Sequence, residues 1–254
     1  MRSSSKARPI AMTGMFCCIS LLCGYPAYGQ LNTVRAHVEI KKKASPKPEE
    51  GVVPPPDLSD VVLWLKLLDR TAAEAKPAEQ PDKRLQLTQK NKGFQPHVLV
   101  VPVGSAVDFP NRDPFFHNVF SLFDGKRFDL GLYEAGASNS VRFDRLGVSF
   151  LFCNIHPEMS AVVIAVDTPY YGVSDRAGNI TISGVPDGTY EVHVWYERSL
   201  AEDLRKLTRT VSVSSVRTDL GTISVPENPN FSPAHKNKYG QDYTSPHARP
   251  YSHP

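Results

Sequence analysis

The sequence predicts an all-β protein made of two β-sandwiches. Short segments of alternating β-branched and aromatic residues recur along the chain, Gly, Pro, Asn and Asp separate them, and helical periodicity is nearly absent. Many short strands between such turns are typical of sandwiches and small barrels. The expected strands are, in order, Val34–Ile40, Val61–Leu67, His97–Val103, Ala106–Phe109, Asn118–Leu122, Ser140–Phe143, Gly147–Cys153, Ala161–Val166, Tyr171–Ser174, Asn179–Ile182, Thr189–Tyr196, Arg209–Val213 and Gly221–Val225.

One stretch, Leu200–Leu207, has the pattern of a helix. Ser199 precedes it and Glu202 follows three residues later, which is the spacing of a capping box. We therefore expect the Ser199 side chain to cap this helix.

The N-terminus has the order of a secretory signal peptide. Residues 1–9 carry three cations and no acid, an apolar run follows from Ile10 to Leu22, and Ala27-Tyr28-Gly29 has small residues at the first and third positions. This predicts a signal peptide over residues 1–29, cleavage near Gly29, and a periplasmic or secreted protein. The alternative is an uncleaved anchor, although the apolar run is short for a membrane span. No later run would span a membrane.

Removal of the signal peptide changes the composition. It takes three cations and lowers the formal net charge from +3 to zero, which leaves no basic stripe for nucleic acid. The exported chain then keeps one thiol, Cys153, and one thioether, Met159. A lone Cys in an oxidising compartment is buried and inert, joined to another molecule, or bound to a ligand.

The heptapeptide 153–159, CNIHPEM, favours a bound metal ion. Cys153, His156 and Met159 stand three residues apart, between two expected strands, so that one loop can direct all three toward a point. His117 lies upstream, at the start of another strand. Two imidazoles, a thiolate and a thioether are the ligands of a blue-copper site. Alternatively, Cys153 is a buried thiol of the core, Met159 fills space in the core, and His117 is a hydrogen-bonded core residue.

The segment Gly93–Asp167 resembles a cupredoxin, of the amicyanin, pseudoazurin and plastocyanin-like type. The resemblance implies a Greek-key β-barrel or sandwich that binds one type 1 copper through His117, Cys153 and His156, with Met159 as the axial ligand. It also implies that Asn118 braces the Cys loop and that Pro157 stiffens it. The residues that carry the resemblance are Phe94, Pro96, Gly104, Val107, Phe109, Asn111, His117, Asn118, Val119, Gly147, Phe150, Phe152, Cys153, His156, Pro157 and Met159.

A second unit is expected at residues 168–225. Its segment 174–197 contains an Asp-x-x-Gly turn, a strand and Pro-x-Gly-x-Tyr, and it resembles the Ig-like carboxypeptidase regulatory-like sandwich. Strands from residues 33–70 would complete this sandwich, and the copper unit would then be inserted into it. Alternatively, the two early strands extend the copper unit. The segment Lys41–Pro56 is expected to be a linker, and the tail 226–254, which lacks apolar periodicity, to be disordered.

These observations predict an exported electron-transfer protein, not an enzyme, in which one type 1 copper cycles between Cu(I) and Cu(II). The partner would be another redox protein, and the short ligand loop suggests methylamine utilisation by resemblance. The alternative function is copper binding or storage, or interaction with the cell envelope, without electron transfer. A nitrite reductase fragment would need a second copper centre, for which the sequence offers no His cluster.

Overall fold

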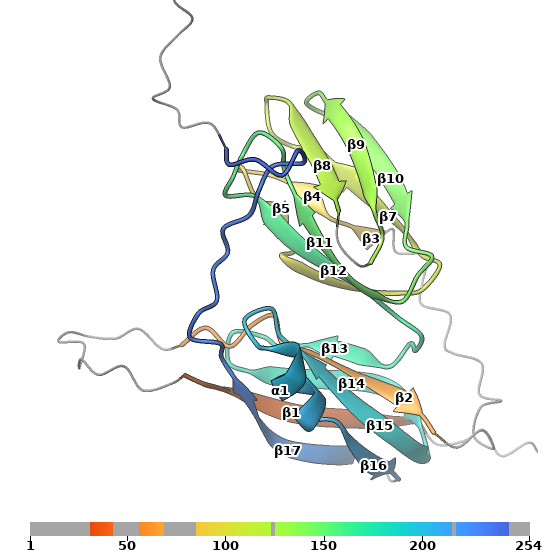
Figure 1. The fold of residues 1–254 in the computed structure, drawn as a ribbon. Coiled ribbons are helices and arrows are strands. Elements are labelled where there is room, and N and C mark those ends of the chain that lie inside the picture. Colours follow the sequence, from red (N-terminus) through yellow and green to blue (C-terminus); the bar gives the residue numbers. More distant parts are fainter. Residues whose placement is uncertain (1–30, 43–55, 69–84, 123–124, 215–216, 244–254) are drawn as a thin grey trace, which may run out of the picture.

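The computed structural model describes residues 31–42, 56–68, 85–122, 125–214 and 217–243. Within these ranges the chain forms seventeen strands and one short helix, which confirms the all-β prediction. Two sandwiches lie one above the other (Figure 1). No helix in the described ranges has the length and hydropathy that a membrane crossing needs. The predicted signal peptide lies outside the described residues.

The first sandwich comprises residues 85–166. Its core fills the space between two sheets and includes Val107, Phe109, Phe143 and Leu151. The larger sheet has the order β6 (Val98–Pro102), β12 (Ser160–Val166), β11 (Gly147–Phe152), β8 (His117–Ser121) and β9 (Phe128–Tyr133). The smaller sheet has the order β10 (Ser138–Arg142), β7 (Ala106–Pro110) and β3 (Leu85–Gln86), and β4 (Thr88–Gln89) pairs with β5 (Phe94–Gln95).

The second sandwich contains the two early strands. One sheet has the order β14 (Asn179–Pro186), β1 (Leu31–Lys41) and β17 (Arg217–Pro226), and the other β13 (Tyr171–Val173), β2 (Val62–Leu67), β15 (Gly188–Trp195) and β16 (Arg209–Val213). Alternation along β1 directs Val34, Ala36 and Val38 into the core. The first sandwich therefore lies between β2 and β13 in the sequence, while those two strands pair in space.

The single helix, α1 (Ala201–Lys206), lies where the sequence predicts it, but the predicted cap is wrong. The N-cap residue is Leu200, and no side chain caps the helix. The Ser199 hydroxyl instead donates a hydrogen bond to the carbonyl of Pro226 at 2.6 Å. The hydroxyl thus fastens the helix entry to the end of β17, which a local capping pattern does not reveal.

An apolar interface joins the two sandwiches. Val98, Val100, Val162 and Ile164 of the first sandwich form one cluster with Val62 of the second, against which Trp64 and Trp195 pack. Strand β12 is consequently buried on both faces, which explains why its sequence SAVVIAV does not alternate. Trp195, expected in a core, lies at this interface.

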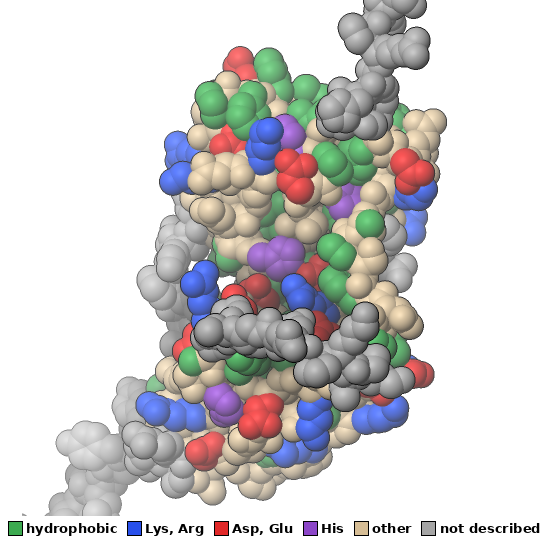
Figure 2. All heavy atoms as spheres, turned by 90° about the vertical axis from the view of Figure 1, so that its left-hand side faces the viewer, with side chains coloured by type: hydrophobic (Ala, Val, Ile, Leu, Met, Phe, Trp, Pro, Cys, Tyr) green, Lys and Arg blue, Asp and Glu red, His purple; other side chains and the backbone are tan. Residues whose placement is uncertain are grey.

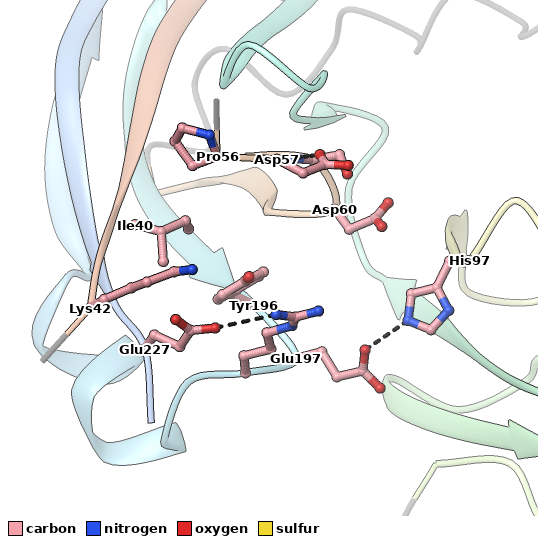
Figure 3. A pocket seen from close by; sticks show the side chains of 11 residues that line it. Ile40, Lys42, Pro56, Asp57, Asp60, His97, Tyr196, Glu197 and Glu227 are labelled. Carbon is pink, nitrogen blue, oxygen red and sulfur yellow. Dashed lines mark hydrogen bonds and ion pairs between the residues drawn. The ribbon is translucent and has the colours of Figure 1, made fainter. Parts of the chain in front are cut away.

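A polar cleft of about 330 Å³ opens beside the apolar interface. Figure 2 shows charged side chains and a histidine gathered around the waist of the molecule. His97, from the first sandwich, points at Glu197, from the second (Figure 3), with 2.7 Å between Nε2 and a carboxylate oxygen. The Nδ1 of His97 lies 3.2 Å from the carbonyl oxygen of Ser160. His97 thus links the two sandwiches through one side-chain contact.

We expect this pair to make the stability of the protein depend on pH. The hydrogen bond to Glu197 raises the pKa of His97 above 6.5, although burial opposes this, and Asp60 adds a smaller favourable charge. The stabilisation is fully present below pH 6.5 and is lost as the pH rises through the raised pKa. Glu197→Gln should therefore lower the free energy of unfolding by up to about 1 kcal/mol at pH 6, because solvent screens this partly exposed pair, and by less at pH 9.

Thermal unfolding of the parent protein and of Glu197→Gln between pH 5.5 and 9 measures this difference in stability. Asp60, whose pKa burial raises, is present in both proteins, as are Arg198 and Glu227 of the same cleft. Glu191→Gln is the matched control, because it removes the His193–Glu191 pair, which also spans 2.7 Å but lies within one strand. Equal pH profiles for the two variants would contradict a special role for Glu197.

Disorder of the tail, predicted for residues 226–254, is wrong over residues 226–243. This segment runs from the second sandwich back to the first (Figure 1), and specific hydrogen bonds fix it at both ends. Its lack of apolar periodicity reflects attachment through polar groups and single aromatic rings. Residues 244–254, with His247 and His253, lie outside the described residues, as does most of the predicted linker.

Candidate metal centre

Strand pairing brings His117 and Cys153 to the same end of one sheet. His117 begins β8, and Cys153 directly follows β11. The two strands are antiparallel neighbours, with Phe120 opposite Phe152, so the start of one lies beside the end of the other. Both side chains are fully buried. The sandwich itself therefore places an imidazole beside a thiol.

The loop 153–159 returns the chain from β11 to β12 in a tight turn. The N–H of Met159 donates to the carbonyl of His156 at 3.1 Å, and the N–H of Cys153 donates to the carbonyl of Met159 at 3.3 Å. Pro157 stands at the second position of this four-residue turn, where its fixed φ is favoured. That Pro157 stiffens the loop stays a prediction.

Three donor atoms converge at this end of the sheet. The Sγ of Cys153 lies 3.7 Å from Nδ1 of His117 and 3.6 Å from Nδ1 of His156, and all three donors lie within 4.8 Å of one another. For an ion about 2.3 Å from sulfur and about 2.0 Å from nitrogen, with about 120° between the bonds, the sulfur and nitrogen would be about 3.7 Å apart. The observed spacing fits a trigonal ion. Among the described residues this is the one such cluster of His, Cys and carboxylates.

Met159 pairs with Cys153 at the base of the ligand loop, through the backbone hydrogen bond of 3.3 Å. Its side chain is fully buried and packs in the same core as Cys153. A thioether in this position is a soft, weak donor that suits Cu(I), whereas a structural zinc site would more often use a further thiolate or imidazole. The donor set therefore fits copper best.

Asp113 orients His117, and the sequence analysis missed it. Its Oδ2 lies 2.8 Å from Nε2 of His117, and both side chains are buried. The backbone N–H groups of Asn91 and Lys92 donate to the same carboxylate at 2.6 and 2.9 Å. Burial acts to raise the pKa of Asp113, but these hydrogen bonds hold it below 3.8. The four-residue spacing in DPFFH was the available signal, because a carboxylate often binds the second nitrogen of a ligating His.

Burial alone would keep the Cys153 thiol protonated. It raises the thiol pKa above 9.0, while the backbone N–H groups of Asn118, Ile155 and His156 act in the opposite direction. Burial and the neighbouring His117 lower the pKa of His156, so that its imidazole is neutral and able to bind a cation. A positive ion between these groups would supply the charge that a buried thiolate lacks, and its binding would release the thiol proton.

Asn118 is predicted to brace the Cys153 loop, and its backbone and side chain make different contacts. Its side-chain amide nitrogen donates to Oδ1 of Asp129 at 2.7 Å and to the carbonyl of Gly131 at 2.9 Å, both on β9. Strand β9 has one residue more than β8 between the pairs Asn118–Leu132 and Phe120–Asp129, and the Gly131 carbonyl that accepts from Asn118 lies in this bulge. The backbone N–H of Asn118, by contrast, donates to the Cys153 sulfur and acts to lower the thiol pKa.

One edge of the site reaches the surface. His156 is half-buried, and the Phe115 ring packs against both His117 and His156, with centroid distances of 5.2 and 5.5 Å. Phe116 and Ile155 nearby are 53% and 42% exposed. Figure 2 shows hydrophobic side chains gathered at the end of the molecule farthest from the second sandwich. Exposed apolar side chains, Phe116 and Ile155, therefore stand near the His156 edge, and the charged residues Glu158 and Lys92 stand beside it.

The Phe residues of segment 120–139 lie in different environments. Phe120 is buried and Phe128 packs against the core of the first sandwich, while Phe123 lies outside the described residues. Strand β9, in the same segment, was not predicted, because FDLGLY carries a Gly and an Asp. Glu158, beside His156, is exposed.

No family model matches the chain. No curated protein matches it either. Among solved structures, a purple cupredoxin from Nitrosopumilus maritimus is 24% identical, with a TM-score of 0.30, over 32% of this chain and 99% of that protein. A copper-containing nitrite reductase from Thermus scotoductus is 23% identical, with a TM-score of 0.33, over 37% of this chain and 26% of the reductase. A Cu(I) amicyanin variant is 19% identical, with a TM-score of 0.32, over 41% of this chain and 98% of amicyanin. These likenesses are too weak to carry a function over to this chain.

Proposed function

We propose that this protein is an exported electron carrier of the cupredoxin type. In this proposal His117, Cys153 and His156 would hold one copper ion, and Met159 would be a further, weaker donor. The observation that carries it is the convergence of one thiol sulfur with two imidazole nitrogens, which lie 3.6 and 3.7 Å from the sulfur. The buried Met159 belongs to the same core as Cys153. When bound, copper would supply a one-electron couple between Cu(I) and Cu(II).

The chain's own contribution would be to hold the donors still. Donors on β8 and at the end of β11 are fixed by the sheet, and Asp113 fixes the His117 ring. The turn at Pro157 fixes His156 relative to Cys153. A site whose donors hardly move favours rapid electron exchange, because little reorganisation accompanies the change in charge.

The His156 edge would be the point of contact with a redox partner. It is the one donor of the three that is not fully buried, and Phe116 and Ile155 supply an apolar surface around it. Glu158 and Lys92 stand beside this surface with one charge of each sign, so the partner would meet an apolar contact with a charged rim. The second sandwich would be of the carboxypeptidase regulatory-like type. It would serve as a rigid support for the first sandwich or attach the protein to the cell envelope.

The visible spectrum of the copper-loaded protein tests this function. We expect the chain from Gln30 onward to become intensely coloured with Cu(II), through charge transfer from the thiolate, to bleach with ascorbate and to recover its colour with ferricyanide. Repeated cycles without loss of copper would support an electron carrier. The full chain, expressed with its N-terminus, should yield the processed protein in the periplasm.

The alternative, copper storage, predicts a different result. A storage site would bind Cu(I) tightly, stay colourless and lose or precipitate copper on oxidation. Tight zinc binding with no colour from copper would also contradict the proposed function.

A further inference from the structure

The C-terminal strap, residues 227–243, begins on the second sandwich. The N–H of Glu227 donates to the carbonyl of Lys41 at 3.0 Å, and that of Asn228 to the carbonyl of Arg198 at 2.7 Å. The Arg198 guanidinium lies 5.8 Å from the centre of the Phe231 ring. From there the strap leaves the second sandwich and reaches the loops of the first (Figure 1).

The far end of the strap has a structure of its own. The Asn237 side-chain oxygen accepts hydrogen bonds from the N–H groups of Tyr239 and Gln241 at 2.9 and 3.0 Å. Its backbone carbonyl accepts one from Gly240, whose φ is +76°. Asn followed three residues later by Gly in NKYGQ was the turn signal in the sequence. The strap therefore presents its side chains from a closed turn.

Two hydrogen bonds tie this end to the ligand loop. The Tyr243 hydroxyl donates to the carbonyl of Cys153 at 2.7 Å, and the backbone N–H of Lys238 donates to Oδ1 of Asn154 at 3.0 Å. Nδ1 of His235 lies 3.2 Å from the Tyr243 hydroxyl and orients it. The strap thus grips the two residues with which the ligand loop begins.

A third contact reaches the opposite side of the site. Nζ of Lys238 lies 2.7 Å from Oδ2 of Asp129. The other oxygen of Asp129 accepts a hydrogen bond from Asn118, the neighbour of His117. The strap therefore connects the segments that carry Cys153 and His117, which are 36 positions apart in the chain.

The strap also covers one way out of the site. Phe152 is bonded directly to Cys153, and its ring would be the nearest covalent route from the sulfur to the surface on that side. The His235 ring stacks on it, with 4.0 Å between centroids and 26° between planes, and Phe152 is 8% exposed. The edge at His156 has no such cover among the described residues.

From these contacts we propose that Tyr243 and its strap are positioning elements of the metal centre. Tyr243 holds the Cys153 loop in its binding geometry through the Cys153 carbonyl. His235 closes the Phe152 side, so that electrons exchange at the His156 edge. The statement on electron exchange rests on the proposed function, whereas the statement on loop position does not.

Alkylation of Cys153 in the metal-free full chain tests the loop position. The buried thiol reacts with iodoacetamide only when the loop opens, and mass spectrometry of the peptide that contains Cys153 gives its rate. We expect Tyr243→Phe, which removes one hydroxyl, to raise this rate about two- to tenfold, the factor of one ordinary hydrogen bond. A stop codon after Asn228 should raise it further.

Tyr239→Phe is the matched control, because Tyr239 lies on the same turn, is 70% exposed, and directs its hydroxyl to the Lys238 side chain, whereas the Tyr243 hydroxyl reaches the ligand loop. It should leave the rate unchanged. Hydrogen exchange in β2 and β15 should also stay as in the parent, which distinguishes opening of the loop from unfolding of the protein.

A second measurement uses the copper-loaded protein. Tyr243→Phe should shift the charge-transfer band and the midpoint potential, and Tyr239→Phe should not. The strap deletion should speed oxidation by ferricyanide, because the His235 ring no longer lies over the Phe152 side. If no copper protein forms, the alkylation result alone decides the loop statement and the proposed function fails separately.

Parental alkylation rates for both Tyr243→Phe and the strap deletion would overturn the positioning role. Equal effects of Tyr243→Phe and Tyr239→Phe would overturn it as well. An unchanged oxidation rate in a folded, coloured deletion variant would refute closure of the Phe152 side.

Discussion

Cys153→Ser should abolish the visible colour of the copper-loaded protein and weaken Cu(I) binding by several orders of magnitude. The colour requires a thiolate donor, and a serine hydroxyl remains protonated in this buried position. A hydroxyl is also a hard donor, which Cu(I) disfavours. The absorption spectrum with Cu(II) and competition with a Cu(I) chelator measure the two effects.

A matched control variant distinguishes the loss of a metal ligand from a general effect of mutation on the protein. His193→Ala removes an imidazole of the second sandwich, which stacks on Trp64 and pairs with Glu191. It should keep both colour and affinity. Cys153→Ser should also keep the far-UV circular dichroism of the parent, because Ser is slightly smaller than Cys. Persistent colour in a folded Cys153→Ser protein would show that the sulfur is not a ligand.

The strands could be predicted because most of them have one face in a core. Alternation in β1 and β15 marks that face directly. Strands β3, β4 and β5 have two residues each and β9 contains Gly131 and Asp129, so none of them gives a periodic signal. The pairing of β1 with β17 spans almost the whole described chain. The likeness of segment 174–197 to a known sandwich suggested that β1 belongs to the second sandwich, but not which strand it pairs with.

The predicted donors come together because they belong to one sheet end and one loop. Cys153, His156 and Met159 are local in the sequence, and a C-x2-H-x2-M spacing already restricts them to a turn. The elements that support them are not local. The four-residue spacing between Asp113 and His117 could have been recognised in the sequence. Tyr243, however, lies 90 positions from Cys153, in a segment whose composition indicates disorder. Single polar contacts over such separations leave no periodic pattern.

Asp113→Asn should weaken copper binding about 10- to 100-fold, the usual effect of losing a group that orients a ligating His. One Asp113 oxygen accepts from Asn91, and the other accepts from both Lys92 and His117. Three donors therefore point at two acceptor oxygens. Asparagine has a single acceptor oxygen, and its amide group would face an N–H donor in a buried space. Either the His117 ring or the 91–92 turn must then move.

Competition with a Cu(I) chelator measures the affinity, and the electron paramagnetic resonance spectrum of the Cu(II) protein reports the donor geometry. Asp144→Asn is the control, because it makes the same chemical change in an exposed pair with Lys126. If the His117 ring moves, the spectrum of Asp113→Asn changes together with the affinity. If the 91–92 turn moves instead, the affinity stays within about twofold of the parent, since the imidazole keeps its place, and the ring would then be held by packing against Phe115 more than by the carboxylate.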